Sequence, residues 1–67
     1  MGRTMTSTEV IAAIESLGWY RVAVVGDHYQ FKHPTIPGKV TIKHPTKDIS
    51  GALLASIEKQ CGARLKK

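Results

Sequence analysis

Gly26 and Asp27 form the sequence feature that most restricts how this chain can fold. They separate a β-branched segment, residues 20–25, from a second segment of strand character, residues 28–33. Glycine at the first central position is what a two-residue type II′ hairpin turn requires. The pattern therefore predicts two antiparallel strands. Pro34 ends the second strand, and a loop over residues 35–38 leads to a third short strand over residues 39–43.

The short turn also predicts which side chains share a face of the sheet. With two turn residues, Val25 lies opposite His28 and Arg21 lies opposite Lys32. The predicted apolar face holds Tyr20, Val22, Val24, Tyr29, Phe31, Val40 and Ile42. The predicted basic face holds Arg21, Ala23, Val25, His28, Gln30, Lys32, Lys39, Thr41 and Lys43.

Segments with helical periodicity flank the strands. Residues 6–9 read Thr-Ser-Thr-Glu, a capping box, and the apolar spacing after them predicts a helix over residues 7–17 that ends at Gly18. Trp19 is expected in the core. A second helix is predicted after an N-cap at Asp48 or Ser50, with an apolar stripe of Leu53, Leu54, Ile57 and Cys61, and it ends at Gly62.

The predicted fold class is α+β, a single small domain of order α-β-β-β-α over residues 1–67. Both helices should cover the one apolar face of the three-stranded antiparallel sheet, which leaves the basic face open. This is the element order of a double-stranded-RNA-binding domain. Residues 1–5 are expected to be disordered or a vector-derived start, and residues 63–67 a basic tail.

Composition restricts the compartment and the partners. The single cysteine, Cys61, excludes an internal disulfide and indicates a reducing cytoplasm. No apolar stretch approaches the length of a membrane span, and the N-terminus has no apolar signal core. The formal net charge is +5, and residues 28–47 hold four lysines, three histidines and no carboxylate. This basic stretch predicts a surface for a polyanion, with a merely solvated basic face as the alternative.

The spacing of candidate ligands argues against metal or cofactor chemistry. His28 and His33 are five residues apart on one predicted strand, so their side chains point to opposite faces. The sequence has no HExxH, no CxxC and no pair of catalytic carboxylates. Cys61 lies on the apolar face of a predicted helix, where a thiol is usually inert. We therefore predict neither a metal site nor a cofactor.

His28 is the residue best suited to catalysis. It begins a strand beside a tight turn, on the predicted basic face. RNA carries its own nucleophile, the 2′-hydroxyl group, so a histidine that transfers protons and nearby cations that stabilise charge can cleave it without a metal. A phosphate would also relieve the expected repulsion between Arg21 and Lys32. The alternative is an exposed hairpin histidine without a role.

Four blocks of the sequence, in order, resemble the HicA toxins. The blocks are residues 7–19, residues 26–34 with Gly-Asp-His-Tyr-Gln-Phe-Lys-His-Pro, residues 40–45 and residues 57–62. The resemblance implies a double-stranded-RNA-binding-like fold and a toxin that inhibits growth by cleaving messenger RNA. It also implies a HicB antitoxin that covers the active face. The family's Gly-Ser-His histidine falls on His28, with Asp27 in place of the usual serine, and RNA contact is implied at Lys32 and, more loosely, at Lys43 and His44.

Three hypotheses follow for the function. The first is an endoribonuclease in which His28 is a general base or a general acid, with His44, His33 or Lys32 as the second proton-transfer group. RNA contact would then involve Arg21, Lys32, Lys39, Lys43 and His44. The second is a small RNA-binding module without chemistry, and the third is a protein-interaction domain.

Overall fold

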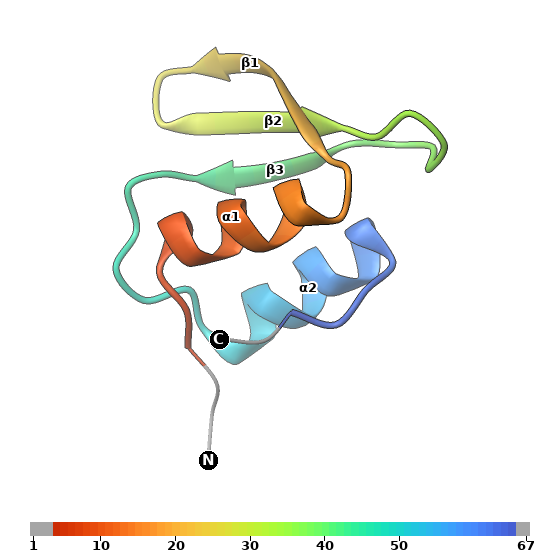
Figure 1. Ribbon diagram of the computed structural model, residues 1–67. Coiled ribbons are helices and arrows are strands. Elements are labelled where there is room, and N and C mark those ends of the chain that lie inside the picture. Colours follow the sequence, from red (N-terminus) through yellow and green to blue (C-terminus); the bar gives the residue numbers. More distant parts are fainter. Residues whose placement is uncertain (1–3, 66–67) are drawn as a thin grey trace.

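Three antiparallel strands form a sheet in the order β1-β2-β3, with β1 at Tyr20–Val25, β2 at His28–Lys32 and β3 at Val40–Lys43. Two helices, α1 at Ser7–Ser16 and α2 at Gly51–Cys61, lie on one side of this sheet (Figure 1). The structure is a computed structural model and describes residues 4–65. The predicted α-β-β-β-α order is confirmed.

Local signals set the ends of both helices. Thr6 Oγ1 accepts the Glu9 backbone N–H (3.1 Å), and Glu9 Oε1 accepts the Thr6 N–H (2.9 Å), so the predicted capping box is present. Ser50, and not Asp48, is the N-cap of α2. Gly62 ends α2 with a φ of 73°, in the left-handed region that glycine adopts without strain.

The β1–β2 turn is as predicted. Gly26 has a φ of 61°, and no described residue other than glycine has a positive φ. This combination fits a type II′ turn, since a type I′ turn needs a positive φ at both central residues. Next to the turn the register is also the predicted one, with Val25 opposite His28 and Ala23 opposite Gln30.

Further from the turn the predicted register is wrong, because β1 contains a bulge between Arg21 and Ala23. Arg21 pairs with Phe31, and Tyr20 pairs with Lys32. An extra residue in one strand reverses the faces of the residues beyond it. Arg21 therefore lies on the helix side of the sheet, and Tyr20 lies on the open side.

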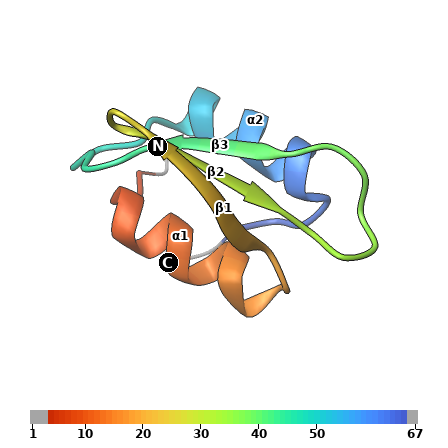
Figure 2. The same ribbon diagram turned by 90° about the horizontal axis from the view of Figure 1, so that it is seen from above.

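The core lies between the helices and strands β2 and β3. Its buried side chains are Met5, Val10, Ile14, Trp19, Phe31, Val40, Ile42, Ile49, Leu54, Ile57, Cys61 and Leu65. The prediction that β1 contributes to this core is wrong, because Tyr20, Val22 and Val24 are between 45% and 49% exposed. The helices make their main sheet contacts with β3, and β1 is the edge strand that β2 separates from β3 (Figure 2). Leu53, predicted in the apolar stripe of α2, is also exposed.

The two ends of the described chain join the core. Met5 is 4% exposed and forms an antiparallel bridge with Ile49, and Leu65 is 2% exposed. The structure thus differs at Met5 and Leu65 from the predicted disordered start and basic tail. The remainder of those predictions, on residues 1–3 and 66–67, lies outside the described residues.

Candidate nucleic-acid interface

The open face of the sheet brings together four of the predicted site residues. His28 begins β2 and pairs directly with Lys43 at the end of β3. Lys32 lies at the other end of β2 and is exposed. Lys39 precedes β3, and its Nζ donates a hydrogen bond to Gln30 Oε1 on the same face (3.3 Å). We call His28, Lys32, Lys39 and Lys43 the basic face.

Asp27 joins the two groups at the turn end of the basic face. Its Oδ1 lies 3.4 Å from His28 Nε2, and its Oδ2 lies 3.9 Å from Lys43 Nζ. The three side chains are 48% to 67% exposed, so these are solvent-screened contacts that contribute little to stability. Such contacts can orient the imidazole and still yield to a stronger anion, such as a phosphate.

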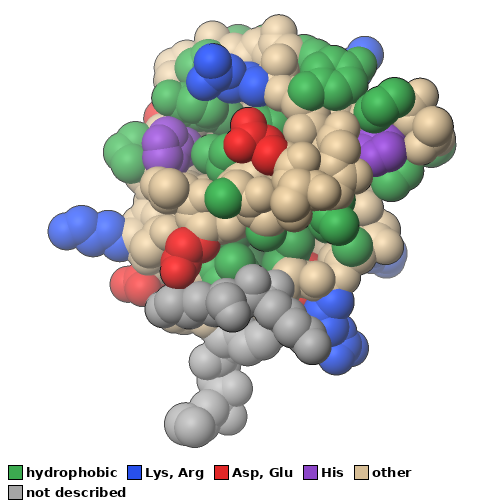
Figure 3. All heavy atoms as spheres, in the orientation of Figure 1, with side chains coloured by type: hydrophobic (Ala, Val, Ile, Leu, Met, Phe, Trp, Pro, Cys, Tyr) green, Lys and Arg blue, Asp and Glu red, His purple; other side chains and the backbone are tan. Residues whose placement is uncertain are grey.

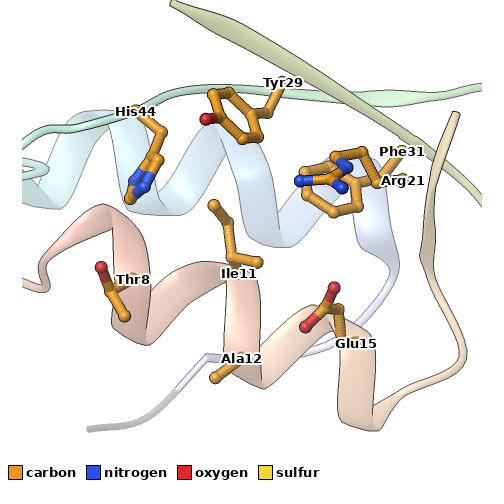
Figure 4. Close-up of a pocket in the computed structure, with 8 residues that line it drawn as sticks. All are labelled: Thr8, Ile11, Ala12, Glu15, Arg21, Tyr29, Phe31 and His44. Atoms are coloured by element: carbon orange, nitrogen blue, oxygen red, sulfur yellow. The ribbon is translucent and has the colours of Figure 1, made fainter. Parts of the chain in front are cut away.

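Arg21 and His44 are not on the basic face, which corrects the sequence interpretation. The Arg21 guanidinium carbon lies 5.8 Å from the centre of the Tyr29 ring on the helix side, so the predicted repulsion with Lys32 does not occur. His44 also contacts Tyr29, edge to face, with 4.9 Å between the ring centres. Figure 4 shows Arg21, Tyr29 and His44 around one pocket.

Tyr20 takes the place on the open side that was predicted for Arg21. It lies directly opposite Lys32 and is 49% exposed. An exposed aromatic ring beside a lysine is the combination that stacks on unpaired bases. Sequence reasoning missed Tyr20, because strict alternation assigned it to the apolar face and no residue of β1 marks the bulge.

His33 has a structural role. Its Nδ1 accepts the backbone N–H groups of Thr35 (3.1 Å) and Ile36 (3.2 Å), so Nδ1 carries no hydrogen in this arrangement. The hydrogen is therefore on Nε2, which donates to the Leu17 carbonyl (2.8 Å). Both ring nitrogens are engaged with the backbone, and neither is available for proton transfer to a ligand.

His28 and Lys43 also border a groove of about 370 Å³ that continues from the edge of β3 to α2. The α2 side of this groove includes Leu53, Ile57 and Gln60. Leu53 is 57% exposed and adds apolar surface to the groove. The basic face is therefore continuous with an apolar surface.

Two further properties concern the described residues 4–65. No three His, Cys, Asp or Glu side chains within this range come close enough together to hold a metal ion. Neither α1 nor α2 has the length and hydropathy that a membrane-crossing helix needs.

The fold and the basic face define the class of this protein: a small α+β domain that presents a histidine among lysines on an open sheet. The family model for the HicA toxin of bacterial toxin–antitoxin systems matches residues 7–63. This match covers both helices and all three strands, so the chain belongs to the HicA toxin family. Membership implies an antitoxin partner. No curated protein matches the chain.

Proposed function

We propose that this toxin is a metal-independent endoribonuclease that cleaves messenger RNA on the basic face, with His28 as the catalytic residue. The observation that carries the proposal is the arrangement at the turn. His28 is exposed, lies opposite Lys43, and is contacted by a carboxylate of Asp27 that also reaches Lys43. A proton-transfer group and a cation thus face the same space.

The chemistry needs one proton acceptor, one proton donor and charge stabilisation. The 2′-oxygen of the RNA attacks the adjacent phosphorus, and the bond from phosphorus to the 5′-oxygen breaks. The products are a 2′,3′-cyclic phosphate and a free 5′-hydroxyl. His28 takes the proton of the 2′-hydroxyl, and the Lys43 ammonium stabilises the negative charge on the phosphorane.

None of the three candidates for the second proton-transfer group shares the position of His28. Both ring nitrogens of His33 are bound to the backbone. His44 lies on the helix side, and Lys32 lies at the opposite end of β2. Solvent would therefore protonate the leaving 5′-oxygen, and we expect slow cleavage.

The rest of the basic face would hold the RNA strand. Lys32 and Lys39, which lie on the basic face, would contact phosphates, and such contacts are the main source of affinity and make binding salt-dependent. Tyr20, beside Lys32, would stack on an unpaired base. These contacts favour single-stranded RNA as the substrate.

A HicB-type antitoxin would neutralise the toxin by covering this face. The exposed Leu53 and the groove beside His28 offer apolar surface next to the lysines, a combination suited to a protein partner that supplies carboxylates. A copurified complex that leaves His28 and the lysines open, with no partner carboxylates near them, would contradict this part of the proposal.

Purified His28→Ala protein tests the catalytic assignment. It should keep its fold and its RNA affinity but lose cleavage by about 10²–10⁴-fold, the usual effect of removing a general acid or base. It should also no longer inhibit growth. Thr41→Ala is a matched control, because Thr41 is an exposed residue of β3, two positions before Lys43, and pairs with Gln30. Retained cleavage would refute the assignment, and retained growth inhibition without any cleavage would favour the RNA-binding module.

A further inference from the structure

A second polar site lies on the opposite side of the sheet from His28. It is a pocket of about 250 Å³ between α1 and strands β1 and β2 (Figure 4). Ile11 and Phe31 give it an apolar lining, and Arg21 and Glu15 enter it from β1 and α1. The space-filling view of this side shows basic, acidic and histidine side chains around exposed hydrophobic atoms (Figure 3).

The bulge in β1 creates the basic wall of this pocket. Without it, Arg21 would pair with Lys32 on the open face. With it, the guanidinium lies over the Tyr29 ring at 5.8 Å. A guanidinium plane is also a surface on which a flat ring can stack. Among the ion pairs between described residues, none joins Arg21 to Glu15, so the carboxylate and the guanidinium both remain available to a ligand.

His44 closes the other end of the pocket and is held in a defined orientation. Its Nδ1 lies 2.6 Å from Ser7 Oγ, and this oxygen accepts the Thr46 backbone N–H (2.8 Å). The Ser7 hydroxyl can donate its hydrogen to Nδ1 while its oxygen accepts the Thr46 N–H. In that tautomer the hydrogen of the neutral ring is on Nε2, which makes His44 a donor toward the pocket.

The pocket thus combines the Glu15 carboxylate, the Arg21 guanidinium, the His44 ring and an apolar lining, and its two charged groups match one nucleobase. The Glu15 carboxylate only accepts hydrogen bonds, and guanine alone offers two adjacent donors, N1–H and the N2 amino group, on its Watson–Crick edge. Its other edge offers the acceptors O6 and N7, the usual partners of arginine. Adenine and cytosine would direct a ring-nitrogen lone pair at the carboxylate.

We infer that this pocket binds a guanine base of the RNA substrate, with Glu15 as the residue that sets the specificity. The inference rests on the proposed function for its substrate class. The pocket runs along β2: its His44 wall lies at the same end of the sheet as His28, and its Arg21 wall lies beside Phe31, toward the other end. Tyr29 follows His28 in β2, and the His44 backbone N–H donates to the Asp27 carbonyl (2.8 Å). A strand that passes around the β1–β2 turn can place a base in the pocket and a phosphate at His28.

Binding of short RNAs tests the inference independently of cleavage. The probes are single-stranded hexauridines with one central guanosine, adenosine or inosine, all with 2′-O-methyl groups that prevent cleavage. Inosine lacks only the N2 amino group of guanosine. Fluorescence anisotropy should show that the guanosine probe binds about tenfold more tightly than either of the others, the usual effect of one bidentate contact. Nuclear magnetic resonance signals of Ile11 and Tyr29 should shift with the guanosine probe.

Glu15→Gln is the decisive variant. Glu15 is exposed on α1, so the change should leave the fold intact, and it should abolish the preference for guanosine. Asp48→Asn is the matched control, since it removes the same charge at an exposed position that does not line the pocket. It should retain the preference.

The inference would be overturned by equal binding of the guanosine and adenosine probes, by an unchanged preference in Glu15→Gln, or by the absence of a shift at Ile11 and Tyr29. Binding of free guanosine monophosphate as tight as that of the oligonucleotide would show a free-nucleotide site and would equally overturn it. If the guanosine preference is present but unmodified RNA is not cleaved, the nuclease proposal fails and the pocket assignment stands.

Discussion

Replacement of His33 by alanine should destabilise the fold, although the side chain looks from the sequence like one more member of a basic stretch. The imidazole joins the end of α1 to the loop after β2. It donates to the Leu17 carbonyl and accepts the N–H groups of Thr35 and Ile36. It also packs edge-on against Trp19, with 5.3 Å between the ring centres. Alanine removes all of these contacts together.

The expected loss can be worked out from these contacts. A hydrogen bond contributes about 0.5–1.5 kcal/mol net, and the low end of that range, about 0.5 kcal/mol for each bond, applies here because two of the three bonds are exposed. The aromatic contact adds about 0.5–1.5 kcal/mol. The sum is a loss of roughly 2–3 kcal/mol in the free energy of unfolding. For a domain of this size, each kcal/mol lowers Tm by about 4–8 °C, so the expected decrease is roughly 8–24 °C.

Thermal and urea unfolding followed by circular dichroism measure this loss. His28→Ala is the natural control, since His28 is exposed and its contact with Asp27 is solvent-screened; the stability of this variant should stay within about 0.5 kcal/mol of that of the unchanged protein. Nitrogen-15 spectra should also show a hydrogen on Nε2 of His33 and none on Nδ1. Equal stability of the two alanine variants, or a hydrogen on Nδ1 of His33, would refute the reasoning.

Three further variants probe other contacts. Ser7→Ala should lower the free energy of unfolding, measured with urea, by about 1–3 kcal/mol, because the Thr46 N–H loses its acceptor and Ser7 is only 1% exposed. A loss below about 0.5 kcal/mol would contradict the hydrogen-bond assignment. Trp19→Phe should lower the free energy of unfolding by less than the 3–5 kcal/mol that is typical when a large aromatic residue is changed to alanine, since the buried indole N–H has no hydrogen-bond partner. A loss above that range would show that the N–H is hydrogen-bonded. Lys43→Gln should lower the slope of log affinity for RNA against log salt by about 1, whereas Lys59→Gln on α2 should leave it unchanged; equal slopes for the two would place the phosphate contact elsewhere.

Most of the fold could be predicted from local sequence signals. The capping box at Thr6, the turn at Gly26 and the left-handed end at Gly62 each depend on residues a few positions apart, so the sequence alone predicted them. The sequence also predicted the position of His28 on the open face, because that position depends only on the β1–β2 turn and on the alternation of side chains next to it. The order of helices and strands then followed from the spacing of apolar residues, which is helical in the flanking segments and of strand type between them.

The sequence predicted the faces of the candidate site correctly only where side chains alternate regularly, and this alternation stops at the bulge in β1. One bulge in β1 moves Arg21 from the basic face to the pocket with Tyr29 and moves Tyr20 the other way. A bulge depends on how the whole strand fits its neighbour, and no residue type marks it here. His33 and His44 show the same limit, because Leu17, which His33 contacts, and Ser7, which His44 contacts, are distant in the chain.

The sequence by itself thus determined the elements, the tight turn and the exposure of His28, since these depend on contacts between near neighbours. Only the tertiary structure decided that β1 stays outside the core, that His33 is bound to the backbone, and that Arg21, Glu15 and His44 meet in one pocket. These outcomes depend on where the helices rest on the sheet. That placement is set by the packing of the core as a whole, around Phe31 and Trp19, and not by any single segment.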